Sequence, residues 1–183
     1  MSEKKGPWTV NQKTLVYENP WIAVTHHDVT NPAGKPGLYG TVSFHNRAVA
    51  VVPLADNKDI WLVGQHRFPL DEYHWEVPMG GAPKHESAEA CALRELKEET
   101  GLTAQRLTRL GHKLHLSNCI SDEEGFIFVA EGLTEGETEM EDTEQLTIRR
   151  LPFEEAYQMV EQGQITDALS VLAILKMRLQ GLA

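Results

Sequence analysis

Three glutamates, Glu95, Glu98 and Glu99, are the residues of this chain whose types and spacing point most clearly to chemistry. Positions i, i+3 and i+4 of an α-helix are neighbours on one side, so three negative charges would face one another there. Each like-charged pair costs about 0.2–0.5 kcal/mol, and Arg94 can pair with only one or two of the three. Hard carboxylate oxygens suit Mg²⁺ or Mn²⁺, and Mg²⁺ commonly links carboxylates to a substrate phosphate. The spacing therefore indicates a divalent-cation site, with a solvated helix face as the alternative.

The segment around these glutamates, residues 79–102, reads MGGAPKHESAEACALRELKEETGL and predicts a loop followed by a helix. Two consecutive glycines near its start form the loop, which follows a strand. Ser87 is a suitable N-cap and Gly101 occupies a C′ position, so the helix is expected at residues 87–100. A narrow stripe of small apolar side chains would let this helix lie close to a sheet, and it consists of Ala88, Cys91, Ala92 and Leu96.

Every defined position of the Nudix box is filled in this segment, which therefore resembles that family. The matching pattern is Gly80-x5-Glu86-x7-Arg94-Glu95-Leu96-x-Glu98-Glu99-x-Gly101-Leu102. The resemblance implies an α+β fold, an α/β/α sandwich in which the box forms a loop, a helix and a second loop. It also implies divalent-metal-dependent hydrolysis of a diphosphate that links a nucleoside to another group, with Mg²⁺ or Mn²⁺ as the cofactor.

Roles for individual residues follow from the same resemblance. Glu95 and Glu99 are expected to bind the metal together with the backbone carbonyl of Met79, and Glu98 is expected to act in catalysis. Metal ions held in this way can stabilise both the attacking and the leaving oxygens of a diphosphate. Arg94 is expected to orient a glutamate by ion pairing. Four residues have structural roles in the motif, namely Gly80, Glu86, Arg94 and Gly101; Glu86 would hold the loop to the helix, with a water-mediated metal contact as the alternative.

A second segment narrows the substrate class. Residues 65–69, Gln-His-Arg-Phe-Pro, followed by Glu76-Val77-Pro78, resemble a segment of ADP-ribose pyrophosphatases. The guanidinium of Arg67 can grip a diphosphate through a forked contact, and the alternative is a surface ion pair. Glu76 could accept hydrogen bonds from the amino group of a base, or be tied to backbone at the end of a strand. Because a proline common in that subfamily is absent from residues 115–119, GDP-mannose and related sugar nucleotides join ADP-ribose as candidates.

An acidic run before the expected strand at 146–150 resembles a loop that supplies the general base and a further metal ligand in this subfamily. By position, Glu144 corresponds to the ligand, and Asp142 or Glu141 to the base. The alternative is that most charges of this run are simply solvated.

The N-terminal part, residues 1–45, is expected to form a β-strand region, and residues 46–183 the hydrolase domain. In this subfamily the N-terminal strands are often exchanged between two subunits, which implies a homodimer. Trp21 follows a turn at Asn19-Pro20 and is a candidate stacking platform for the base. Core packing of Trp21 is an equal alternative.

Composition excludes several other classes of protein. The chain has 183 residues with a formal net charge of −10, from 27 acidic and 17 basic residues, which disfavours binding to a nucleic-acid backbone. The longest apolar run, around residues 48–55, is far shorter than the roughly 20 residues that span a bilayer. The polar start carries no apolar signal segment, so no membrane partner is expected. Two widely spaced cysteines, Cys91 and Cys119, favour a reducing cytoplasm over a disulfide framework.

The remaining elements must position these residues. Strands are expected at residues 13–17, 22–29, 37–44, 48–54, 60–65, 73–77, 105–116, 126–130 and 146–150. Two more helices are expected at 153–162, with Pro152 in the N1 position, and at 167–179.

The function that the sequence favours is metal-dependent hydrolysis of nucleoside diphosphate sugars, which gives a nucleoside monophosphate and a sugar phosphate. Two alternatives stay open. One is a Nudix hydrolase of nucleoside triphosphates or dinucleoside polyphosphates, and the other is a non-catalytic Nudix module that senses a nucleotide.

Overall fold

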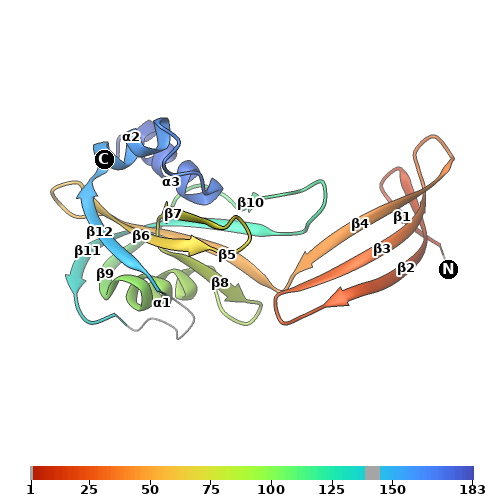
Figure 1. Ribbon diagram of the computed structural model, residues 1–183, viewed down its shortest axis with the longest axis horizontal. Coiled ribbons are helices and arrows are strands. Elements are labelled where there is room, and N and C mark those ends of the chain that lie inside the picture. Colours follow the sequence, from red (N-terminus) through yellow and green to blue (C-terminus); the bar gives the residue numbers. More distant parts are fainter. Residues whose placement is uncertain (1, 139–144) are drawn as a thin grey trace. The chain divides into compact units, whose positions relative to one another are not determined.

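A computed structural model describes residues 2–138 and 145–183 of the chain (Figure 1). The strands in these parts are β1 (Glu3–Lys5), β2 (Trp8–Glu18), β3 (Ile22–Thr30), β4 (Pro36–Phe44), β5 (Asn46–Pro53), β6 (Asp59–Arg67), β7 (Glu72–Glu76), β8 (Met79–Pro83), β9 (Leu102–Arg109), β10 (Leu114–His115), β11 (Glu124–Glu135) and β12 (Thr147–Pro152). The helices are α1 (Ala88–Thr100), α2 (Phe153–Glu161) and α3 (Ala168–Leu179).

Two compact units make up the molecule. The first, called here the N-terminal unit, comprises the chain up to Arg47 together with residues 115–124. Its sheet is antiparallel, in the strand order β1-β2-β3-β4. The later segment joins this sheet through backbone contacts, since Val42 N–H donates to the carbonyl of Ile120 at 2.9 Å and Phe44 N–H donates to Asp122 Oδ1 at 2.8 Å.

The second unit, called here the larger unit, comprises residues 48–114 and 125–183. One of its sheets has β11 parallel to β5 and antiparallel to β9, with β8 on the other side of β5. Another sheet has the order β12-β6-β7 and is antiparallel. Helix α1 lies on one side of these strands, and α2 and α3 lie on the other (Figure 1). The predicted α+β fold with helices on both sides of the sheets is confirmed.

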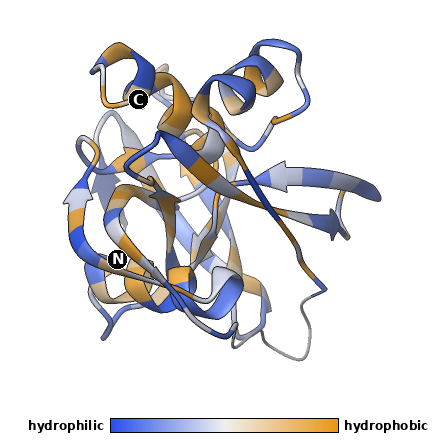
Figure 2. Ribbon diagram, turned by 90° about the vertical axis from the view of Figure 1, so that its left-hand side faces the viewer, coloured by the Kyte–Doolittle hydropathy of each residue, from blue (hydrophilic) through white to orange (hydrophobic). Residues whose placement is uncertain are grey.

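The core of the larger unit sits between β5, β11 and α1. Val49, Val51 and Phe128 of the strands pack with the small side chains that α1 turns inward, among them Cys91 and Leu96. In Figure 2 apolar residues colour stretches of the strands and parts of the helices. The predicted stripe of small residues on α1 is therefore confirmed, and it brings the helix backbone close to the sheet. No helix in the described parts of the chain is both long and apolar enough to cross a membrane.

Three local predictions are wrong. The segment expected as one strand at 105–116 is divided into β9 and β10, because Gly111 has a φ of +92°, a left-handed conformation that interrupts extended backbone. The residues expected as a glycine loop after Pro78 form strand β8, which pairs with β5. Pro152 is the N-cap of α2 rather than its first helical residue.

Candidate active site

Helix α1 begins and ends at the residues that capping chemistry requires. Ser87 has extended backbone, and its hydroxyl accepts the N–H of Ala90 at 3.1 Å. Gly101 ends the helix with a φ of +71°, and its N–H donates to the carbonyl of Lys97 at 2.8 Å. A side chain on Gly101 would also collide with the backbone of Gly136. The helix that carries the glutamates is therefore fixed at both ends.

Strand β8 approaches α1 so closely that only glycine fits at one position. A Cβ atom on Gly80 would overlap the carboxylate of Glu95. Glu95 is itself buried, since only 7% of the residue is exposed. The absence of a side chain at Gly80 thus allows the Glu95 carboxylate to lie directly against the backbone of the strand.

Glu99 lies one turn further along the same face of α1. It is 1% exposed, and its Oε2 accepts the backbone N–H of Met79 at 3.0 Å. Two buried carboxylates, Glu95 and Glu99, consequently converge on two adjacent residues of β8. Burial of carboxylates is costly unless they are paired, hydrogen-bonded or bound to metal, so this arrangement needs strong local compensation.

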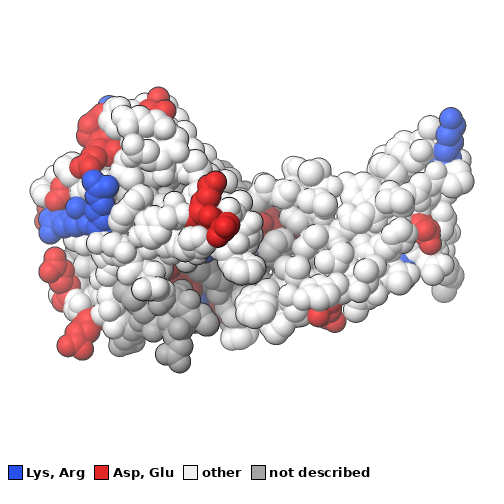
Figure 3. Space-filling model, viewed as in Figure 1, with Lys and Arg blue, Asp and Glu red and all other residues white. Residues whose placement is uncertain are grey.

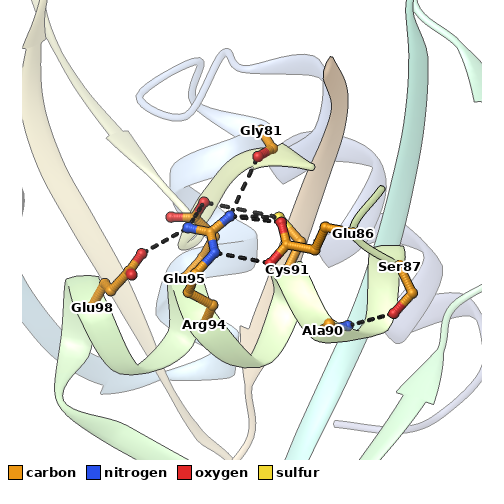
Figure 4. A network of polar contacts seen from close by, with 8 residues as sticks. All are labelled: Gly81, Glu86, Ser87, Ala90, Cys91, Arg94, Glu95 and Glu98. Atoms are coloured by element: carbon orange, nitrogen blue, oxygen red, sulfur yellow. Dashed lines mark hydrogen bonds and ion pairs between the residues drawn. The ribbon is translucent and has the colours of Figure 1, made fainter. Parts of the chain in front are cut away.

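Arg94 supplies part of that compensation (Figure 4). Its Nε and Nη2 donate to the two carboxylate oxygens of Glu86, both at 3.0 Å. Its Nη1 donates to Glu95 Oε1 at 2.7 Å and to Glu98 Oε2 at 2.8 Å. Nη2 also reaches the carbonyl of Gly81 at 3.3 Å. Hydrogen bonding to Arg94 lowers the pKa of Glu86, and the hydrogen bonds to Glu86 raise the pKa of Arg94.

The guanidinium of Arg94 therefore links Glu86, which precedes the helix, to two glutamates of α1. Two of the three glutamates identified in the sequence, Glu95 and Glu98, are paired to it. Cys91 lies beneath this network, with its Sγ 3.9 Å from Glu95 Oε1. Burial raises the pKa of Cys91 to about 12, so the thiol is protonated at neutral pH.

The residues present fit a divalent cation in chemistry. Glu95, Glu99 and the backbone at Met79 offer hard oxygen donors, and the bare backbone of Gly80 leaves the carboxylate of Glu95 beside the strand. Within residues 2–138 and 145–183, no group of three or more His, Cys, Asp or Glu side chains is placed to hold a metal ion.

A second charge pair joins the partly exposed Arg67 of β6 to the buried Glu76 of β7. Arg67 Nε donates to both carboxylate oxygens of Glu76, at 2.9 and 3.1 Å, and Nη2 also donates to Glu76 Oε2. Glu76 is 3% exposed, and its hydrogen bonds raise the pKa of Arg67, with smaller contributions from the charges of Asp167 and Glu99. Of the glutamates of α1, Glu99 is thus the one whose charge acts on Arg67.

This pair changes the interpretation of both residues. Glu76 is held by a guanidinium rather than by backbone, and its carboxylate is directed at Arg67. Among the hydrogen bonds between described residues, those of the Arg67 side chain use Nε and Nη2. Its Nη1 takes part in none of them, so the N–H groups of Nη1 can donate hydrogen bonds to an anion.

Trp21 lies in the N-terminal unit and is 66% exposed. Its backbone N–H donates to Asn19 Oδ1 at 2.8 Å, in the turn before β3. The alternative that Trp21 packs in the core is therefore wrong. Glu141, Asp142 and Glu144 lie outside the described residues.

One buried polar residue near this site carried almost no signal in the sequence. Ser170 is fully buried on α3, and its Oγ accepts the N–H of Val77 at 3.1 Å. Only its position as a serine among the apolar residues that begin α3 could have drawn attention to it. Its partner Val77, in the turn after β7, could not be found without the tertiary structure.

Comparison with known proteins places this geometry in a family. Residues 44–169 match the model of the NUDIX domain, and residues 8–42 match that of the nucleoside diphosphate sugar hydrolase N-terminal domain. The chain therefore belongs to the Nudix family, and the prediction that it is a Nudix hydrolase is confirmed.

Similar proteins cover nearly the whole chain. An ADP-ribose pyrophosphatase of Bacillus subtilis (strain 168) is 34% identical over 170 residues, which span 92% of this chain and 91% of that protein. An ADP-ribose pyrophosphatase of Mycobacterium tuberculosis is also 34% identical, over 91% of this chain and 81% of that protein. The solved structure of an ADP compounds hydrolase has a TM-score of 0.86 and 25% identity, covering 100% of this chain and 99% of the other.

Proposed function

We propose that this protein hydrolyses the diphosphate bond of nucleoside diphosphate sugars, with ADP-ribose and sugar nucleotides such as GDP-mannose as the candidate substrates. The products would be a nucleoside monophosphate and a sugar phosphate. The observation that carries the proposal is the pair of buried carboxylates, Glu95 and Glu99, that faces the glycine strand β8. The similarity to ADP-ribose pyrophosphatases over nine-tenths of the chain supports the substrate class.

Nudix hydrolases generally use divalent metal ions, and we propose Mg²⁺ or Mn²⁺ here. The ligands would be Glu95, Glu99, the carbonyl of Met79 and Glu144. A bound ion of this kind would neutralise phosphoryl oxygens and lower the pKa of a water molecule.

The protein's own groups would prepare the substrate for attack. Arg67 would hold the diphosphate through its Nη1 edge, since Glu76 fixes the other edge of its guanidinium. Glu76 would act through Arg67 in place of the direct contact with a base considered from the sequence. Arg94 would hold Glu95 in position and keep Glu98 close to the reacting groups. Either Glu141 or Asp142 would remove the proton of the attacking water.

We further propose a homodimer in which the region at residues 1–45 is shared with a second copy and residues 46–183 form the hydrolase domain. The support is a set of large, exposed apolar side chains on the N-terminal unit, called here the apolar patch: Leu15, Val16, Tyr17, Trp21 and Leu38. On the face drawn in Figure 3, uncharged side chains dominate the N-terminal unit. Large exposed apolar side chains can form interaction surfaces, and Trp21 would then offer a stacking platform for the base.

The cellular setting we propose is the reducing cytoplasm. Cys91 and Cys119 are both free, in keeping with a chain that does not rely on disulfides. The net charge of −10 favours a small-molecule substrate reached through metal ions over a nucleic-acid partner.

A substrate panel tests the proposal directly. The protein is incubated with ADP-ribose, GDP-mannose, ATP and a dinucleoside polyphosphate, with Mg²⁺ or with EDTA, and the products are separated by chromatography. We expect monophosphate release from a nucleoside diphosphate sugar that stops with EDTA. Repeating the reaction in ¹⁸O-labelled water shows which phosphorus is attacked.

Two results would contradict the proposal. Faster cleavage of the triphosphate or the dinucleoside polyphosphate would favour the other substrate class. Ligand-induced thermal stabilisation without any product would favour a nucleotide-sensing module.

A further inference from the structure

The turn between β7 and β8 is held from several directions at once. It consists of four residues, Glu76, Val77, Pro78 and Met79, and each makes a hydrogen bond to a different element. The partners are Arg67 on β6 to the Glu76 carboxylate, Ser170 on α3 to the Val77 N–H, Val51 on β5 to the Pro78 carbonyl and Glu99 on α1 to the Met79 N–H.

The contact with Val51 belongs to strand pairing, and those with Arg67 and Glu99 belong to the charged site. The contact with Ser170 belongs to neither. Ser170 Oγ accepts the Val77 N–H at 3.1 Å, and both residues are completely buried. A backbone N–H that is shielded from solvent cannot form a hydrogen bond with water if its protein acceptor is lost. The hydroxyl of Ser170 is therefore the group that satisfies Val77.

The first turn of α3 is itself fixed against β7. Asp167 caps the helix by accepting the N–H of Ser170 at 2.8 Å. Beside it, Thr166 Oγ1 lies 3.1 Å from His74 Nδ1. The start of α3, which carries Ser170, therefore has contacts of its own besides the bond to Val77.

We propose that Ser170 is a positioning residue for the metal-binding part of the active site. By fixing Val77 it fixes the register of Met79, two residues later, against the carboxylate of Glu99. This inference rests on the proposed function, since Met79 and Glu99 are the ligands proposed there. Its effect runs from α3 through the turn to Met79, without contact between Ser170 and the substrate.

Replacing the hydroxyl tests this role. In Ser170→Ala the N–H of Val77 loses its acceptor, and Ser170→Cys replaces the hydroxyl with a somewhat larger thiol that is a much weaker acceptor. Ser170→Thr restores the hydroxyl oxygen. The matched control is Ile174→Val, which trims a fully buried side chain one turn later on α3 and leaves the hydrogen bond intact.

Two measurements report on position without turnover. Electron paramagnetic resonance gives the Mn²⁺ affinity, and hydrogen exchange gives the protection of the amides of Val77 and Met79. We expect Ser170→Ala and Ser170→Cys to bind Mn²⁺ about tenfold more weakly, the lower end of the effect of losing a group that supports metal ligands. Amide protection should fall at both positions, and kcat should fall more than KM rises. Ser170→Thr should recover part of the Mn²⁺ affinity, and Ile174→Val should keep all of it.

The proposal is overturned if Ser170→Cys keeps Mn²⁺ affinity and amide protection within about twofold of the wild type, or if Ile174→Val loses as much affinity. Should Ser170→Ala not fold, the Cys and Thr variants decide the question. A wild-type protein that hydrolyses no nucleoside diphosphate sugar would contradict the proposed function, while the Mn²⁺ and exchange comparison would still decide the role of Ser170.

Discussion

The N-terminal unit and the larger unit bury their apolar side chains to very different extents. In the larger unit, Val49, Val51 and Leu62 are inaccessible to solvent, and α1 completes the core with small residues. In the N-terminal unit, most of β2 is exposed, including Leu15 and Val16. The larger unit therefore completes a core with its own chain, whereas the N-terminal unit presents apolar surface that another surface can cover.

Sequence patterning already contains this difference. Strand β5 ends in a continuous apolar run, as strands buried on both faces do, and all of its last five residues are buried. In the N-terminal unit, β2 mixes apolar with polar residues, and eight of its eleven residues are exposed. The proposed metal ligands Glu95 and Glu99 belong to the unit with the completed core, where ordered neighbours can hold carboxylates at fixed positions.

The largest effect should come from removing one buried charge in the larger unit. In Glu99→Gln the amide oxygen still accepts the N–H of Met79, so the fold should be kept while a proposed metal ligand is lost. We expect kcat to fall by at least about 100-fold, equivalent to about 2.7 kcal/mol in the activation barrier. Steady-state kinetics with Mg²⁺ and a thermal melt measure the two properties. The control is Glu89→Gln, an exposed position in the first turn of α1, and near-full activity of Glu99→Gln would contradict the metal assignment.

A glycine in each unit gives a second comparison. Gly80→Ala would force a Cβ atom into the carboxylate of Glu95, whereas a Cβ atom on Gly40 of β4 meets nothing within 4 Å. Overpacking of this kind costs about 1–3 kcal/mol, so we expect that loss in the free energy of unfolding for Gly80→Ala and less than about 0.5 kcal/mol for Gly40→Ala. Urea denaturation measures both. Equal losses of unfolding free energy in the two variants would show that β8 and α1 have room for a side chain at residue 80.

Local patterns in the sequence were enough to predict the elements of the site but not its tertiary connections. Ser87, Gly101 and the stripe on α1 are local signals of capping and packing, and they predicted the helix and its buried face. The turn at Gly111 and the joining of residues 115–124 to the N-terminal unit depend on contacts with distant strands. The same is true of the bond between Ser170 and Val77, whose partners are 93 residues apart.

Charge pairing shows the same limit. The spacing of the box predicted that Arg94 would meet glutamates of its own helix, because i to i+4 neighbours are set by helix geometry. The pairing of Arg67 with Glu76 depends on how β6 pairs with β7. In that register Arg67 lies opposite Glu72, and Glu76 lies opposite Val63, so the ion pair joins residues that are not direct cross-strand partners. A motif can name both residues without showing that they bind each other.

The apolar patch of the N-terminal unit gives a third test. Leu38 is 71% exposed, and Leu38→Asp would place a charge in the proposed dimer interface. We expect the dimer dissociation constant to rise by about tenfold, or about 1.4 kcal/mol, in analytical ultracentrifugation. Leu179→Asp is the matched control, since Leu179 is 85% exposed at the end of α3 in the larger unit. A wild-type protein that is monomeric at micromolar concentration, or an equal effect of both variants, would contradict the role of the patch.

The smallest expected effect concerns the small buried region that the N-terminal unit does possess. His27 is buried there beside Val29, with Nε2 2.9 Å from Thr41 Oγ1, and Nδ1 has no hydrogen-bond partner among the described residues. Burial is the main cause of a lowered pKa for His27. The positive charges of Lys5 on β1, Lys13 on β2 and His26 on β3 lower it further, against a smaller opposing contribution from Glu3.

The sign of the pH dependence follows from that lowered pKa. Between the ordinary value near 6.5 and the lower folded value, the unfolded chain binds more protons at His27 than the folded chain does. The free energy of unfolding therefore decreases as pH falls below about 6.5, with a slope of at most about 1.4 kcal/mol per pH unit for one proton. His27→Gln should remove this part of the slope between pH 7 and pH 5 in urea denaturation, while His112→Gln, at an exposed position of the larger unit, should retain it. If the unfolding free energies of wild type and His27→Gln change equally with pH, burial does not keep His27 neutral in the folded protein. The N-terminal unit would then lack a desolvated interior even at His27, in contrast to the larger unit.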